Sequence, residues 1–142
     1  MAATILAIAD AVVAELNTAR FSRPVVAQRH YQPQFDLSEM TDLKVTVVPR
    51  SLVSQPLDRS SHSFDYQIDV AVQQKTDMSQ ASLDAMMALV EEIADHFRKR
   101  PLSNYPSARC VEVKNEPIYL LEHLHELRVF TTVLSVTYRA WR

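Results

Sequence analysis

Apolar and polar residues alternate strictly over residues 64–73, and this is the most regular pattern in the chain. The apolar side of the alternation consists of Phe64, Tyr66, Ile68, Val70 and Val72. A period of two, with aromatic and β-branched residues on one side, is typical of an antiparallel strand that buries one face. We therefore expect a strand here, with its apolar side in the core.

A helix is predicted shortly after this strand. Its apolar residues form one stripe at helical spacing: Leu83, Met86, Met87, Val90, Ile93 and Phe97. Asp77 and Gln80 have the spacing of a capping box at the start of the helix. Arg98, Lys99 and Arg100 place positive charge at the C-terminal end of the helix dipole, and the proline that follows prevents continuation. We expect this helix to cover the apolar side of the strand.

The same two periodicities predict one further helix and four further strands. The helix covers residues 3–16, and the strands are centred on residues 25–27, 43–47, 109–114 and 129–140. The last strand carries apolar residues on both faces, which favours a central place in the sheet. The order α-β-β-β-α-β-β predicts one α+β domain over residues 1–142, with a mainly antiparallel sheet and two helices packed on one side.

Residues 50–62 differ in composition from the segments around them. They contain four serines, one proline and two arginines, with only three apolar residues. This composition predicts a long, mobile loop between the second and third strands. A connection of that length in a compact domain is usually either functional or disordered, and both interpretations stay open.

Composition excludes several classes of protein. A chain of 142 residues with 47% hydrophobic content is long enough for a single core. A net charge of −2 argues against a dedicated nucleic-acid-binding protein. The single cysteine excludes an internal disulfide. The apolar start of the chain is interrupted by Asp10 and Glu15 and is not expected to be a signal peptide, and no segment has the length of a membrane span.

The chain contains no glycine. The dinucleotide-binding fingerprint, the P-loop and the nucleophile elbow all need a backbone position without Cβ, so the sequence excludes these three motifs. The common nucleotide-binding enzymes are therefore not expected.

Few residues suggest catalysis. His123 and His125, flanked by Glu122 and Glu126, could supply metal ligands, but on a helix the two histidines would point in different directions. A solvated surface cluster is the favoured interpretation. Cys110 is interpreted as a core residue. We predict no catalytic residue, metal site or cofactor.

Four stretches of the chain carry a resemblance to a known family. They are RHYQPQFDLSEMTDLKVTVVPR, FDYQIDVAVQQK, LVEEIADHFRKR and EPIYLLEHLHELRVFTTVLSVTYR. In the order of its predicted elements and in the general character of its sequence, the chain resembles the tail-terminator (tail-completion, or head–tail joining) proteins of long-tailed bacteriophages. The resemblance extends over nearly the whole chain without a short diagnostic motif.

The resemblance implies a structural protein rather than an enzyme. Such proteins form a ring, typically a hexamer, that ends polymerisation of the tail tube and presents a surface to the head–tail connector. DNA passes through the ring without specific binding. The implied location is the head–tail junction of the virion, after assembly in the cytoplasm of the bacterial host. Residues 50–62 would be the loop that reaches the tube or a neighbouring subunit, with contacts from Arg50, Leu52, Arg59 and His62.

Two further groups of residues are candidate contacts. Asp65 and Asp69 lie on the polar side of the third strand, which carries no cation of its own, and a channel lined by them would repel DNA phosphates. The alternative is that they only face solvent. Tyr138, Trp141 and Arg142 are a candidate partner contact, with a Trp that covers the edge of the core as the alternative.

Three other functions remain open at this stage. One is a different neck or head-completion component of the phage. The second is a small metal-dependent hydrolase that uses the region of His123 and His125. The third is a soluble, dimeric binding module.

Overall fold

The fold was analysed in a computed structural model that describes residues 3–31, 43–75, 77–115 and 129–141. The described elements are α1 (Thr4–Thr18), β1 (Ala27–Arg29), β2 (Lys44–Pro56), β3 (His62–Lys75), α2 (Gln80–Lys99), β4 (Arg109–Asn115) and β5 (Val129–Trp141). Their order and type confirm the predicted α+β fold.

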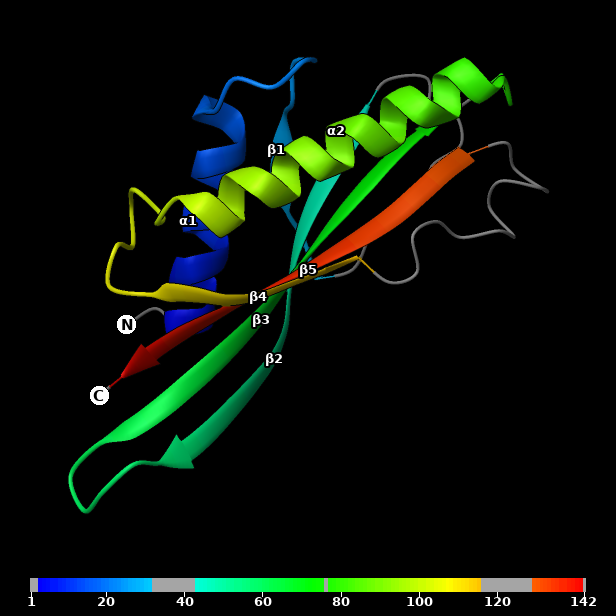
Figure 1. Ribbon diagram of the computed structural model, residues 1–142. Helices are drawn as coiled ribbons and strands as arrows, with labels where there is room; N and C mark the ends of the chain where they lie inside the picture. Colours follow the sequence, from blue (N-terminus) through cyan, green and yellow to red (C-terminus); the bar gives the residue numbers. More distant parts are fainter. Residues whose placement is uncertain (1–2, 32–42, 76, 116–128, 142) are drawn as a thin grey trace.

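The five strands form one sheet in the order β1-β2-β3-β5-β4. β1 runs parallel to β2, and the other neighbours are antiparallel. Both helices lie on the same side of the sheet, and the β2–β3 hairpin extends beyond them (Figure 1). As predicted, β5 is an interior strand, between β3 and β4.

The core lies between the helices and one face of the sheet. On that face Val70 is paired with Val47 and Leu134, and Ile68 is paired with Val136. The helices contribute buried side chains to the same cluster: Ile8, Val12 and Leu16 from α1, and Leu89, Val90, Ile93 and Phe97 from α2. Each such side chain stabilises the fold by about 1.5–3 kcal/mol. The apolar side predicted for β3 and the predicted stripe of α2 are confirmed.

The start of α2 differs from the prediction. Ser79 is the N-cap, and its Oγ accepts a hydrogen bond from the Ser82 N–H at 3.1 Å. Asp77 instead accepts one from the Ser79 N–H, at 2.9 Å from N to Oδ1. The predicted capping box of Asp77 and Gln80 was therefore wrong, because the serine nearest the first turn satisfies the free N–H group. The predicted end of the helix at Lys99 and Arg100 is confirmed.

The turn before α2 contains an unusual backbone conformation. Met78 has φ of 67° and is the one described residue with a positive φ. This region of backbone space favours glycine, since a Cβ is crowded there. A chain without glycine places a methionine at this position.

The first strand is shorter and later than predicted. Val25 and Ala27 are buried, but Val26 between them is exposed and only Ala27–Arg29 pairs with β2. Asn17 at the end of α1 holds the start of the strand, since its Oδ1 accepts a hydrogen bond from the Ala27 N–H at 2.7 Å.

Residues 50–62 are not a long loop, which corrects the prediction. β2 continues to Pro56 and β3 begins at His62, with Ser54 opposite Phe64. A change of register between Pro49 and Ser51 marks a bulge at Arg50. The strands are joined by residues 57–61 alone. Serine and proline suggested a loop, but an exposed strand needs no buried apolar residues, so its composition can be that of a loop.

Neither helix in the described part of the chain is long and apolar enough to cross a membrane.

Candidate interaction surface

The outer half of β2 lies at an edge of the sheet, and the tip of the β2–β3 hairpin projects beyond the other strands (Figure 1). β1 accompanies β2 only as far as Val47, while β5 continues beside β3 to Ser63, which is opposite Gln55 of β2. Beyond Ser63 the two strands have only each other as described neighbours. The side chains of Leu52, Val53 and Leu57 are 50%, 52% and 57% exposed in this outer half of the hairpin. We define residues 51–63 as the hairpin arm.

The base of the arm is anchored in the core. Tyr66 is buried opposite Tyr138 of β5, and the Phe64 ring stacks on the Tyr66 ring with 6.2 Å between centroids. His62 lies against Phe64 in turn, with 6.2 Å between their ring centroids. A line of aromatic contacts therefore runs from the core to the arm.

The tip of the arm is closed without glycine. The Asp58 carboxylate accepts hydrogen bonds from the backbone N–H groups of Ser60 and Ser61, each at 2.9 Å, and the Leu57 N–H donates to the Ser61 carbonyl at 3.0 Å. The hydrogen bond from the Ser60 N–H is the main reason why the pKa of Asp58 lies below its usual value. The carboxylate replaces the positive-φ residue that a tight hairpin turn otherwise needs.

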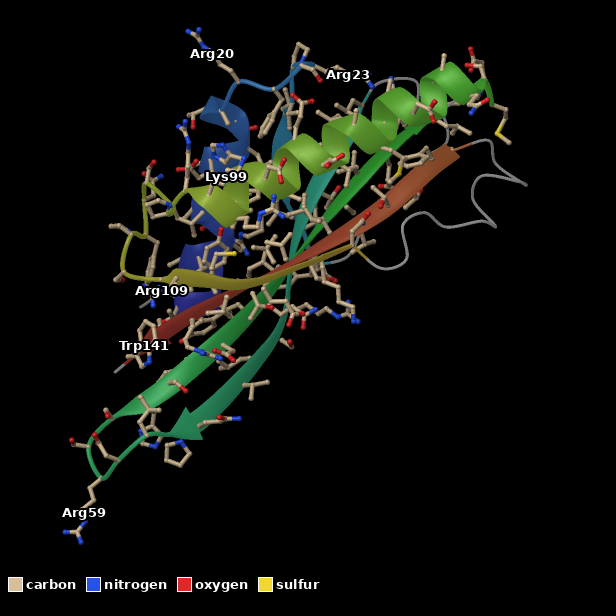
Figure 2. The ribbon with its side chains drawn as sticks, in the orientation of Figure 1. Arg20, Arg23, Arg59, Lys99, Arg109 and Trp141 are labelled. Carbon is tan, nitrogen blue, oxygen red and sulfur yellow. The ribbon has the colours of Figure 1, made fainter. Side chains whose placement is uncertain are left out.

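The four residues predicted for tube docking are all on or beside the arm. Arg50 lies at the bulge where the arm begins, Leu52 is on β2, and His62 is exposed at the start of β3. Arg59 lies at the tip and points away from the molecule (Figure 2). The structure thus distributes them along a strand pair, from the bulge to the tip, rather than on a mobile loop. Sequence reasoning missed Val53 and Leu57, whose exposure depends on the arm being a strand pair.

Asp65 and Asp69 lie on the face of the sheet opposite the helices, where other strands supply the cations that β3 lacks. Arg139 binds Asp65 through two hydrogen bonds, Nε to Oδ1 at 2.7 Å and Nη2 to Oδ2 at 3.0 Å. Asp69 accepts hydrogen bonds from Arg50 at 3.0 Å and from the Ser135 hydroxyl at 2.7 Å. The idea of an acidic, cation-free face is therefore corrected: each carboxylate is paired.

The pairing affects protonation on this face. The hydrogen bonds from Arg139 hold the pKa of Asp65 below its usual value, and the pKa of Arg139 is raised in return. Both groups stay ionised at neutral pH, so the pair presents a dipole rather than net charge.

The candidate partner contact at the C-terminal strand separates into two parts. Tyr138 is fully buried, and burial raises its pKa. It is a core residue, which corrects the prediction, because its position opposite Tyr66 faces the helices. Trp141 is 48% exposed at the end of β5, opposite Ser63 of the arm (Figure 2). Arg142 lies outside the described residues.

Glu15 of α1 joins α2 and the segment after it. Its carboxylate lies 2.7 Å from His96 Nε2 and accepts hydrogen bonds from the Ser103 N–H at 2.8 Å and the Ser103 hydroxyl at 2.6 Å. Burial raises the pKa of Glu15, but the hydrogen bonds from Ser103 and His96 outweigh it, and the pKa lies below its usual value. Serine and histidine both bind the carboxylate rather than each other, so they do not form a nucleophile–base pair. The cluster is a link between elements.

The other candidates for chemistry give no catalytic geometry. Burial raises the pKa of the Cys110 thiol, the opposite of what a reactive cysteine needs. The histidine, cysteine and acidic side chains within the described ranges form no group of three that could hold a metal ion. His123 and His125 lie outside those ranges.

Sequence reasoning also missed a separation of charge along α2. Toward the start of the helix, Asp84 and Glu91 line a groove, and at its end Lys99 and Arg100 line a pocket together with Arg109 of β4. The signal was present, since Asp84 and Glu91 are seven residues apart and therefore share one side of a helix.

Comparison with models of known protein families finds no match for this chain, and no curated protein is significantly similar to it in sequence. Its own surface features are therefore the basis for inferring what it does.

Proposed function

We propose that this protein is a structural subunit that self-associates into a ring at the end of a bacteriophage tail tube. The ring ends growth of the tube and joins the tail to the head–tail connector. The observation that carries this proposal is the hairpin arm, a paired strand extension that exposes apolar side chains at the edge of the sheet and at its tip.

The arm has the properties of a docking element. Exposed apolar side chains gathered on one projection are typical of a protein–protein contact. The arm is continuous with β3, and β3 is paired on both sides in the sheet, so the arm is directly connected to the core. The arm is therefore assigned to contact with the tail tube protein, through Leu52, Leu57 and Arg59.

The sheet offers two edges for further strand pairing. Among the described residues, β2 has no neighbour beyond Val47 on the side of β1, and β4 has none on its outer side. Long strands with open edges are normally covered or paired. The two open edges therefore leave room for further copies of this chain beside the sheet. A hexamer within the virion is the proposed form.

The paired carboxylates suit a surface that DNA passes. Asp65 with Arg139, and Asp69 with Arg50, present balanced charge. Such a surface lacks the unpaired cations that hold phosphates and make DNA binding strong. We therefore expect DNA to pass this surface without specific binding.

The test compares ring formation and tube docking in the same samples. Leu52→Asp with Leu57→Asp places charge on the arm and is expected to abolish binding to purified tail tubes in a co-sedimentation assay. Negative-stain microscopy is expected to show rings in the variant as in the native protein. Val26→Asp, at another exposed valine far from the arm, is the matched control and should dock normally.

Two results would contradict the proposal. One is a native protein that stays monomeric at all concentrations by light scattering. The other is an arm variant that docks on tail tubes as well as the control does.

A further inference from the structure

A cationic pocket lies where α2 ends and β4 begins. It has a volume of about 310 Å³, and its lining contains Arg98, Lys99, Arg100 and Arg109 and, within the described residues, no carboxylate. Arg98 is paired with Asp95, while the other three cations make no ion pair with a described residue. Figure 2 shows Lys99 and Arg109 on the same side of the molecule.

The helix dipole does not explain this pocket. Cations in the last turn of a helix interact favourably with its C-terminal end, and this accounts for Lys99 and Arg100. Arg109 belongs to β4 and has no such role. Two carboxylates of α2 lie near Lys99 and Arg100: Asp95 is paired with Arg98, and Glu92 accepts hydrogen bonds from Ser22 and keeps its charge. The four cations of the pocket therefore exceed the two neighbouring carboxylates, and positive charge remains in excess.

An acidic groove lies between the same helix and the other end of β4. It has a volume of about 440 Å³, with Asp84 and Glu91 at its rim. Apolar side chains line it between them: Met87, Ala88, Ala94 and Leu134. Asn115 closes one side and is held by hydrogen bonds from its Nδ2 to Thr132 Oγ1 and the Val133 carbonyl. Asp84 and Glu91 are exposed and make no ion pair within the described ranges.

The groove and the pocket cannot neutralise each other within one subunit. Along the helix, Asp84 is roughly 22 Å from Lys99 and Glu91 is roughly 12 Å from it. Both distances exceed the Debye length of roughly 8 Å at physiological ionic strength. Between two subunits the two surfaces are complementary, since one has unpaired cations and the other unpaired carboxylates beside an apolar floor.

We propose that neighbouring copies of this chain join head-to-tail through α2, with the cationic pocket of one copy seated against the acidic groove of the next. Because the two surfaces differ, the contact can repeat from copy to copy around a ring. Because both surfaces lie along α2, an antiparallel pair of helices would also bring each pocket to the groove of the other copy and would end at a dimer, and particle mass distinguishes the two arrangements. It rests on the self-association in the proposed function but not on the tail tube.

A second copy is favoured over nucleic acid as the occupant. A phosphate backbone would use the pocket alone, and the carboxylates of the groove on the same helix would repel it. Only a partner with both signs of charge uses both surfaces, and the chain itself, with a net charge of −2, is such a partner.

The experiment is a charge exchange between two variants. One carries Lys99→Glu and Arg109→Glu, and the other carries Asp84→Lys and Glu91→Lys. Each variant alone brings like charges together, so its self-association is expected to weaken about tenfold or more. An equimolar mixture restores opposite charge at every contact of an alternating ring and is expected to recover native-sized particles. Mass photometry measures the particles, and circular dichroism confirms that each variant is folded.

Lys75→Glu is the matched control, because Lys75 is an exposed cation at the end of β3, outside the arm and outside both surfaces of the proposed contact. This variant should form rings at the same protein concentration as the native protein. Raising the salt concentration should weaken association of the native protein and of the mixture alike.

Four outcomes would overturn the head-to-tail contact: folded variants that each assemble like the native protein, a mixture that stays dissociated, a mixture that stops at dimers, or cation variants that lose only DNA binding in a filter assay. Failure of the proposed function is distinguishable. Native rings that dissociate on charge reversal but do not bind tail tubes support the contact and contradict the tube-docking role.

Discussion

The two halves of β2 lie in one strand but have different surroundings. In the inner half, residues 45–48 carry buried side chains, and Val45 and Val47 face the helices, with Val47 fully inaccessible. Residues 51–56 continue the same backbone pairing into the arm, where Leu52 and Val53 are half exposed. Strand formation is therefore independent of burial here. The inner half stabilises the fold, and the outer half is free to contact another molecule.

The largest expected effect is the difference in stability between aspartate substitutions at two valines of β2, one in each half. Val47→Asp places an unpaired charge in the core and should destabilise the protein by about 4 kcal/mol or more, so that it is unfolded or insoluble. Val53→Asp should change stability by no more than about 0.5 kcal/mol, because its side chain is already in water. Urea unfolding followed by circular dichroism measures both. Equal losses would show that the arm is part of the core.

The second effect concerns Glu15, whose carboxylate joins α1 to α2 and to the segment after α2. Glu15→Gln removes charge from a buried carboxylate that binds Ser103 and His96, and should cost about 1–3 kcal/mol at neutral pH. The folded-state pKa of Glu15 lies below its usual value, so its stabilising effect is present above the unfolded-state pKa and is lost as pH falls through the folded-state pKa.

The difference in Tm between native protein and Glu15→Gln should therefore shrink as the pH is lowered below about 4.5. Differential scanning calorimetry across this range checks the sign, and taking the difference cancels other carboxylates such as Asp65. A Tm difference that widens as the pH falls would contradict the stabilising role of the Glu15 carboxylate.

The third effect is on the face of the sheet opposite the helices. Arg139→Gln removes the pair with Asp65 and should lower the urea midpoint only slightly, since the side chains are partly exposed and the pair is screened by solvent. Arg109→Gln, at a cation without a described ion pair, should cost nothing measurable. A large fall in the urea midpoint for Arg139→Gln would place this pair among the main stabilising contacts of the fold.

The smallest effect is at the turn before α2. Met78→Gly relieves the positive φ and should leave stability unchanged or raise it by about 0.5 kcal/mol. Met87→Gly within α2 should instead lower stability by about 1 kcal/mol or more. Thermal unfolding distinguishes the two, and a clear fall in Tm for Met78→Gly would show that the methionine side chain is needed in the turn.

The elements best predicted from sequence are those that bury one face. The alternation of β3 and the stripe of α2 could be read directly, because burial imposes the period of the backbone on the choice of residues. The arm could not be predicted in this way. Its residues face water, so their composition carries no such period, and only pairing with β3 makes them a strand.

The ion pairs of the candidate surface were also beyond local reasoning. Asp65 and Arg139 are 74 positions apart, and Arg50 reaches Asp69 through a bulge. Register across strands decides which charges meet, and no short window of sequence contains it. The burial of Tyr138 has the same cause, since it follows from the position opposite Tyr66.

The chain by itself determined the α+β order, the apolar faces of β3 and α2, and the absence of glycine-dependent sites, because each of these depends on local periodicity or on residue type alone. The tertiary structure decided where the sheet projects, which carboxylates are neutralised and how charge is divided along the α2 surface. Those features depend on contacts between residues far apart in sequence, whose geometry exists only once the strands are in register.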